Sequence, residues 1–126
     1  MNALDPRPVA TVAQFEDGLI RMRDNYGIPP YGLEIFRAFA SAPGHTLTQQ
    51  TLANALGCKD AYANRSIGNL SHTLADAMHF TPTSQYGPGD PRWWPLIAYS
   101  SSEVEDQWTL RPELLQALGN LRWVKQ

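Results

Sequence analysis

The sequence has few of the features that mark secreted, disulfide-bonded or membrane proteins. Its one cysteine, Cys58, cannot form an internal disulfide, which suits a reducing compartment. No apolar run approaches the roughly 20 residues that a membrane-spanning helix needs. The N-terminal segment MNALDPRPVA lacks the basic start and the apolar core of a signal peptide. We therefore expect a soluble, cytoplasmic protein with no membrane partner.

The chain also lacks an excess of basic charge. Its 10 Lys and Arg residues stand against 12 Asp and Glu residues, which gives a net charge of −2 and a pI of about 5.8. Contacts with phosphate supply much of the affinity of nucleic-acid-binding domains, so this balance argues against strong nonspecific DNA binding. It is compatible with a locally basic surface, and most of the basic residues are arginines, which suit bidentate contacts with phosphate or guanine.

Residue clusters for catalysis or metal binding are missing as well. His72 and His79 would lie two helical turns apart, too far to hold one metal ion alone, and Cys58 has no second cysteine beside it. His45 is expected in a loop. The segment GPGDP lacks the lysine and the strand-to-helix context of a phosphate-binding loop. We expect no enzyme activity, no cofactor and no metal.

What the sequence does have is a strong helical pattern. The chain has 126 residues, 43% of them hydrophobic, which is enough for one domain with its own core. Apolar residues at spacings of three and four predict helices, and Pro and Gly clusters separate them. The expected helices cover residues 9–26, 31–41, 49–57, 60–78 and 112–121.

Three of these helices carry specific expectations. The first should bury a stripe of apolar residues that ends at Tyr26, and the second should bury Leu33 together with Phe36, Phe39 and Ala40. Thr48 is the expected N-cap of the third helix, and Gly57 its end. Asp60 is the expected N-cap of the fourth. The buried stripe of the fourth helix would comprise Ala63, Ile67, Leu70, Leu74 and Ala77 or Met78.

Extended segments are few. Thr46–Leu47 suits a very short strand, and Trp93–Ser100 and Gln107–Pro112 suit two strands joined by the polar turn SSEVED. Pro95 favours an edge position for the first of the pair. Residues 81–95 are rich in Pro and Gly and predict an ordered loop.

The order of these elements predicts a mainly α protein with a small β-hairpin, of the α+β class. From the second helix onward it matches a winged helix-turn-helix, in which three helices present the third to the DNA major groove beside a hairpin wing. Residues 1–30 would form an N-terminal arm and an amphipathic helix, and residues 31–126 the winged helix-turn-helix domain with a C-terminal helix. The amphipathic N-terminal helix would either pack on its own trihelical core or build a dimer.

The fourth helix is the candidate DNA-reading element. At 100° per residue its polar side lies opposite the apolar stripe. Asn can bond adenine and Arg can bond guanine, while Lys59 and the amides at the helix start could hold a phosphate. An ordinary solvated helix face is the alternative explanation. The outward residues are Ala61, Arg65, Gly68, Asn69, His72 and Asp76, with Asn64 at the margin.

The expected hairpin gives mixed indications. Trp93 and Trp94 should point to opposite faces of a strand, where one packs in the core and the other anchors the loop or contacts DNA, and Trp108 should be core by the same alternation. The turn SSEVED carries three acids that would repel phosphate, which argues against a standard DNA-binding wing. Arg92 and Arg111 at the base of the hairpin could compensate for these acids.

Four segments together resemble a known family. IFRAFASAPGHTLTQQTLANALG, AYANRSIGNLSHTLADAM, RWWPLIAYS and WTLRPELLQALGNLRWV are similar to the winged-helix DNA-recognition modules that accompany bacterial HNH-type and modification-dependent restriction endonucleases. The resemblance implies recognition of duplex DNA, sometimes with modified cytosine, and places Asn64 and Gly68 on the DNA-facing helix. It departs from that family in having no nuclease motif and an acidic wing.

The leading hypothesis is therefore a non-catalytic protein of bacterial or phage origin that binds double-stranded DNA, either sequence-specifically or through a base modification. The alternative is a winged helix that binds a protein through the same surface and inhibits or regulates a bacterial nucleic-acid or defence enzyme. Either form could be a monomer or a homodimer. The residues expected at the DNA are Lys59, Ala61, Asn64, Arg65, Gly68, Asn69, His72 and Arg92.

Overall fold

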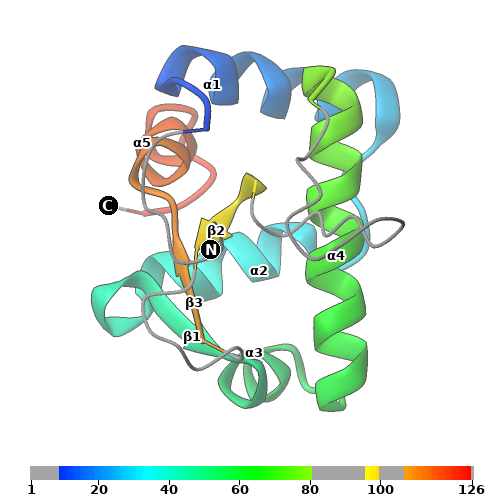
Figure 1. The fold of residues 1–126 in the computed structure, drawn as a ribbon, viewed down its shortest axis with the longest axis vertical. Helices are drawn as coiled ribbons and strands as arrows, with labels where there is room; N and C mark the ends of the chain where they lie inside the picture. The colour runs from blue at the N-terminus through cyan, green and yellow to red at the C-terminus, as the bar shows by residue number, and fades with distance from the viewer. Residues whose placement is uncertain (1–8, 81–95, 100–106, 126) are drawn as a thin grey trace.

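A computed structural model describes residues 9–80, 96–99 and 107–125 of the chain. These residues form a mainly helical α+β structure with a small antiparallel sheet (Figure 1). The helix α4 runs along one edge of the molecule, from α3 at one end to α1 at the other (Figure 1). The elements are α1 (Val12–Arg21), η2 (Met22–Tyr26), α2 (Gly32–Ser41), η3 (Pro43–His45), β1 (Thr46–Thr48), α3 (Gln49–Leu56), α4 (Asp60–Met78), β2 (Ala98–Tyr99), β3 (Gln107–Leu110) and α5 (Pro112–Asn120).

Local side-chain chemistry determines where several helices begin. Thr11 accepts a hydrogen bond from the backbone of Gln14 at 3.1 Å, and the Gln14 side chain accepts one from the backbone of Thr11 at 2.8 Å. Thr48 and Thr51 form the same reciprocal pair at the start of α3, which confirms Thr48 as its N-cap. Pro112 occupies the first turn of α5, where its missing N–H costs nothing.

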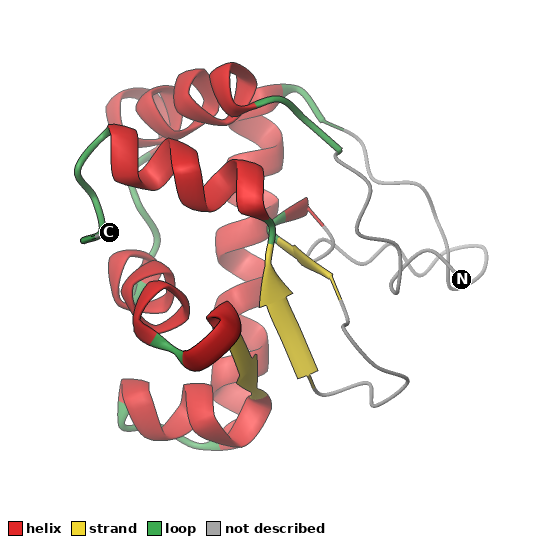
Figure 2. Ribbon diagram, turned by 90° about the vertical axis from the view of Figure 1, so that its left-hand side faces the viewer, coloured by secondary structure: helices red, strands yellow, loops and turns green. Residues whose placement is uncertain are grey.

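The sheet joins one strand from the first half of the chain to two from the second half. The strand order is β1-β3-β2, and both pairs are antiparallel. Leu47 lies opposite Trp108, and the hydroxyls of Thr46 and Thr109 are 2.8 Å apart. Most of the helices lie on one side of the strands (Figure 2). The sheet thereby ties the segment before α3 to the segment before α5.

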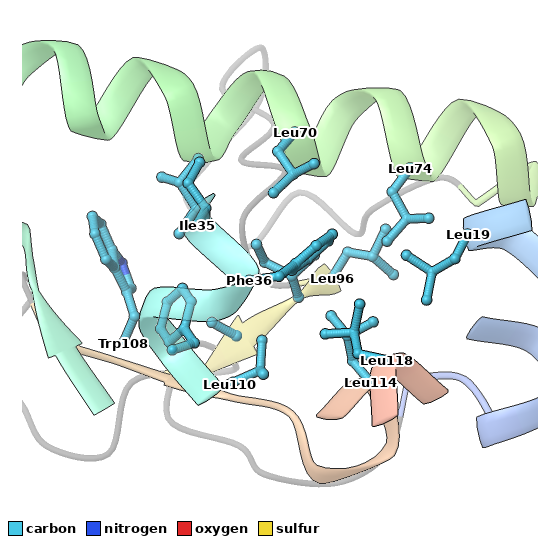
Figure 3. Close-up of a cluster of buried hydrophobic side chains, with 14 of the residues drawn as sticks. Leu19, Ile35, Phe36, Leu70, Leu74, Leu96, Trp108, Leu110, Leu114 and Leu118 are labelled. Carbon is cyan, nitrogen blue, oxygen red and sulfur yellow. The ribbon is translucent and has the colours of Figure 1, made fainter. Parts of the chain in front are cut away.

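A single hydrophobic cluster unites the helices with the sheet. Phe36 of α2 lies near its centre, between the inner face of α4 and the start of α5 (Figure 3). Trp108 contributes from β3 and is buried, as its strand position predicts. The apolar face of α1, with Phe15 and Leu19, is fully buried and packs on α4 and α5. Of the two uses considered for the N-terminal helix, the structure shows packing within its own chain.

The end of the first helix differs from the expectation. The regular α-helix stops at Arg21, and Met22–Tyr26 forms a π-helical turn in which the Gly27 N–H donates to the Met22 carbonyl at 2.7 Å. This wider turn breaks the 3.6-residue period. Met22 is therefore buried, whereas the Tyr26 side chain is 50% exposed instead of continuing the apolar stripe.

The buried face of α2 is rotated slightly around the helix axis from the face that the sequence predicted. Ile35, Phe36 and Phe39 are fully buried, whereas Leu33 and Ala40 are only half-buried. Around the helix Ile35 lies close to Phe39, whereas Leu33 and Ala40 lie towards the edges of the apolar side. Contact with α4 and the sheet selects the face that includes Ile35.

Two further boundaries needed correction. Lys59 is the N-cap of α4 and makes no side-chain capping bond, while Asp60 is the first helical residue, where its charge still suits the positive end of the helix dipole. The strand β2 begins only at Ala98, because Leu96 and Ile97 lie in a buried turn before it. The predicted loop 81–95 and the turn SSEVED lie outside the described residues.

Candidate nucleic-acid interface

The turn between α3 and α4 positions the candidate interface. Gly57 closes α3 with φ 68° and ψ 35°, in the left-handed region that glycine enters without strain. The Cys58 N–H donates to the Ala53 carbonyl at 3.0 Å, which satisfies one carbonyl at the helix end. Ala53 is itself buried, so its small side chain allows α3 and α4 to approach closely. The sequence predicted this glycine turn correctly.

One side of α4 is held firmly against the core. The predicted stripe of Ala63, Ile67, Leu70 and Leu74 is fully buried. The Ser71 hydroxyl, also buried, donates to the Ile67 carbonyl at 2.8 Å and so needs no partner outside the helix. With this side fixed, the orientation of the opposite side is fixed as well.

The opposite side of α4 is exposed, as the helical geometry predicted. A Cβ atom added to Gly68 would meet no heavy atom within 4 Å, so the middle of the face lies open to an approaching surface. Gly68 itself is half-buried. The exposed side chains are Lys59 at the N-cap and Ala61, Asn64, Arg65, Asn69, His72 and Asp76 along the helix.

The charges on this face are arranged unevenly. Within the described part of the chain, neither Lys59 nor Arg65 takes part in an ion pair. His72 Nε2 lies 3.8 Å from Asp76 Oδ1 one turn further on, and both side chains are about half exposed. The unpaired cations thus lie towards the start of α4, where Asp60 also lies, and a second acid, Asp76, lies near its end.

Tyr62 is an exposed aromatic residue that the sequence did not single out. It is 44% exposed, and its ring meets that of Tyr31 edge-on, with centroids 5.8 Å apart and planes at 89°. Tyr31 is the left-handed residue before α2. The spacing in the sequence could have identified Tyr62 as part of this face. Tyr62, Arg65 and Asn69 follow one another at intervals of three and four along one side of the helix.

The expected basic residues at the hairpin base do not both join this interface. Arg111 is buried, and its guanidinium carbon lies 5.8 Å from the centroid of the Tyr99 ring. Its backbone N–H donates to the Ile97 carbonyl at 3.0 Å. The Arg111 side chain is therefore part of the interior, where the aromatic ring stabilises its charge, and it is not exposed for contact with a phosphate. Arg92, Trp93 and Trp94 lie outside the described residues.

The residues considered for metal binding occupy separate places. His45 Nδ1 lies 3.3 Å from the Phe39 carbonyl oxygen, while His79 closes α4 in the left-handed conformation. Cys58 is a half-buried free thiol. Among residues 9–80, 96–99 and 107–125, no three potential ligands gather into a metal site. No helix in these ranges is both long enough and apolar enough to span a membrane.

Comparison with known proteins adds no relative to this picture. A scan against protein-family models and searches of curated proteins and of solved structures found no match to the chain.

Proposed function

We propose that the chain is a winged helix-turn-helix protein that binds double-stranded DNA through α4 and catalyses no reaction. The order of elements from α2 to β3 and the sheet order β1-β3-β2 support the winged-helix architecture. In that architecture α2, α3 and α4 are the three helices, and α4 is the one that enters the major groove. The resemblance to restriction-associated modules points the same way.

The observation that carries the proposal is the open outer face of α4. Arg65 and Asn69 lie one turn apart on it, and Gly68 between them leaves room for a base-pair edge to approach. Arg is suited to guanine and Asn to adenine in the major groove, because each can form two parallel hydrogen bonds there. The N-cap residue Lys59 is close enough to the helix start to hold the adjacent backbone phosphate.

The net charge of the chain indicates that DNA binding would be specific rather than general. A net charge of −2 gives weak attraction to DNA of arbitrary sequence. Affinity must therefore come from contacts with particular bases or with a modified base, such as the modified cytosine that the resemblance implies. We expect binding to be specific for a sequence or a modification.

The test is a selection from random duplexes at low salt, run with and without cytosine methylation. We expect one duplex class to be enriched and its binding to weaken as salt rises. Arg65→Ala and Asn69→Ala should each weaken it about tenfold or more, because each removes a bidentate contact. Arg21→Ala, an exposed arginine that pairs with Asp17 on α1, is the matched control and should bind normally. Failure of every duplex to bind would exclude the proposal.

Tyr62 favours one alternative function. Tyrosine is enriched at protein–protein interfaces, and Tyr62 is 44% exposed on α4. The same face of α4 would then bind a bacterial nucleic-acid or defence enzyme and regulate it. A pull-down with the chain as bait, with nuclease treatment, distinguishes the two functions. Recovery of one such enzyme that Tyr62→Ala abolishes would favour the protein partner, and tight duplex binding without any recovered enzyme would favour DNA.

A further inference from the structure

We infer that the chain has a second binding site, for a nucleotide, between α2 and the segment that follows α5. An open hollow of about 700 Å³ lies there, bordered by the last turns of α2 and by residues 119–125. Its volume falls within the range of small-molecule sites. The chain segment that lines it lies on the side of the molecule away from α4, where the C-terminus is marked (Figure 1). It is therefore separate from the candidate DNA interface.

The charge of this hollow is of one sign. Arg37, Arg122 and Lys125 line it, and no acidic residue is among the described residues that do. Arg37 Nε donates to the Trp123 carbonyl at 3.3 Å, which orients the guanidinium and leaves its two terminal nitrogens for another acceptor. Within the described ranges none of the three cations takes part in an ion pair. Three cations that have no ion-pair partner among the described residues favour an anion with several oxygens, such as a phosphate chain.

Arg122 lies at the end of α5 in a left-handed backbone conformation. The Arg122 N–H donates to Gly119 and the Trp123 N–H donates to Leu118, at 3.0 and 2.9 Å, and together they close α5 with the usual double hydrogen bond. In this closure Arg122 has φ 63°, a left-handed position that favours glycine or asparagine. The corresponding position is Gly57 in α3 and His79, with φ 54°, in α4. The charge of Arg122 in the hollow, beside Arg37 and Lys125, is therefore what indicates a role in binding.

Trp123 supplies the second half of the ligand's chemistry. Trp123 lines the same hollow as the three cations, and its half-buried side chain also packs against the core. A nucleobase stacks well on an indole, and such stacking tolerates any base. A phosphate chain beside a planar ring is the chemistry of a nucleoside di- or triphosphate. The same base and phosphate could also be offered by a single-stranded nucleic acid, so the test must separate the two sources.

Isothermal titration calorimetry of the full chain at low salt tests this assignment with four probes. ATP carries ring and phosphates, tripolyphosphate lacks the ring, adenosine lacks the phosphates, and a short single-stranded oligonucleotide supplies the same groups in a polymer. We expect ATP or the oligonucleotide to bind. Tighter binding of ATP would indicate a free nucleotide as the ligand, and tighter binding of the oligonucleotide would indicate a single-stranded nucleic acid. Tripolyphosphate and adenosine should each bind at least about tenfold more weakly than ATP if the nucleotide is free.

Two substitutions locate the binding. Arg122→Gly should weaken nucleotide binding about tenfold or more because a charged hydrogen-bond donor is lost, and its melting temperature should equal or exceed that of the parent because the left-handed strain is relieved. Trp123→Leu should weaken ATP binding and leave tripolyphosphate binding unchanged. Arg21→Ala is again the matched control. The inference is overturned if neither ATP nor the oligonucleotide binds at millimolar concentration, if tripolyphosphate binds as tightly as the better of the two, or if Arg122→Gly binds like the parent.

Discussion

The two halves of α4 have different neighbours. Its C-terminal half, Leu70–Met78, lies against α1 and the π-turn, with Leu74 beside Leu19 in the core (Figure 3). The Tyr26 hydroxyl donates to the Asp76 carbonyl there at 3.4 Å. Its N-terminal half, Asp60–Asn69, packs on α3 and α2 with fewer buried side chains and carries the open face around Gly68.

The two halves of α4 therefore have different roles, one in packing and one in binding. The C-terminal half contributes apolar packing and so fixes the direction of the whole helix axis. The N-terminal half has fewer buried side chains, Ile67 among them, and its other side presents Arg65 and Asn69 to a ligand. Substitutions on the exposed side of the first half of α4 should therefore change binding, and substitutions at its buried C-terminal positions should change stability.

The largest effect is expected at Leu74. Leu74→Ala leaves a cavity among fully buried side chains and should lower the free energy of unfolding by about 2–5 kcal/mol. Asn69→Ala, on the exposed face of the same helix, should change it by no more than about 0.5 kcal/mol. Urea unfolding followed by circular dichroism measures both. Equal losses from the two substitutions would contradict the buried position of Leu74 and the exposed position of Asn69.

The next largest effect is a difference in stability between substitutions at two glycines, Gly18 and Gly68. A Cβ at Gly18 of α1 would clash with the side chain of Met78, whereas a Cβ at Gly68 would meet open space. Gly18→Val should therefore destabilise the protein by about 1–3 kcal/mol. Gly68→Val should stay within about 0.5 kcal/mol of the parent.

Thermal and urea unfolding of the two glycine variants give the comparison directly. Adding Met78→Ala to Gly18→Val should recover part of the loss, since the two side chains compete for one space. An unchanged stability of Gly18→Val would show that α1 does not hold the C-terminal half of α4 as described.

A third prediction distinguishes two kinds of contact at the N-terminal half. Lys59→Ala should weaken binding to all duplexes similarly and reduce the salt slope by about 1, because one phosphate contact is lost. Asn69→Ala should cost about 1–3 kcal/mol on the preferred duplex and little on others, because a base contact is lost. Fluorescence anisotropy across a salt series measures both. Identical salt slopes and identical losses of preference would refute these roles.

The smallest effect is expected from the ion pair between Arg23 and Asp24 within the π-turn. Arg23 Nε donates to Asp24 Oδ1 at 2.8 Å, and this hydrogen bond, with the charge of Arg23, holds the pKa of Asp24 below its usual value. A lowered pKa in the folded state gives stability above the ordinary pKa of Asp, and this stability is lost as pH falls through the lowered value.

Both side chains of this pair are solvent-exposed, so water and salt screen the interaction. Asp24→Asn should therefore leave the melting temperature unchanged at neutral pH and should not alter its decline in acid. Differential scanning calorimetry at several pH values checks this. A clear loss at neutral pH that disappears in acid would mean that charge, and not only apolar packing, holds this end of α4.

Periodicity predicted the parts of the fold in which one helix face alone is apolar. The stripe of α4 from Ala63 to Leu74 and the glycine turn at Gly57 are examples, since spacing and left-handed geometry are local properties. Periodicity failed at Tyr26, because the π-turn rotates this side chain outward. In α2 the expected face included Leu33 and omitted Ile35, although Ile35 lies closer to Phe39 around the helix.

The candidate interface was predictable to the same extent. The exposure of Arg65 and Asn69 follows from the wheel of one helix. The role of Arg111 does not follow from the sequence, because a charged residue at a strand end is expected to be exposed, and only the folded chain places the Tyr99 ring beside it. The hollow around Trp123 could not be predicted from the sequence either, since α2 and residues 119–125 meet only in the folded chain.

The central claim is that the exposed face of α4, from the N-cap residue Lys59 to His72, is the DNA-binding surface. Amide chemical shifts of the labelled chain, followed during titration with the selected duplex, test it most directly. We predict that the largest changes fall at Lys59, Ala61, Arg65, Gly68, Asn69 and His72, with Leu114, Ala117 and Leu118 of α5 unaffected. Changes centred on α5 or the C-terminal segment, with none on α4, would contradict the account.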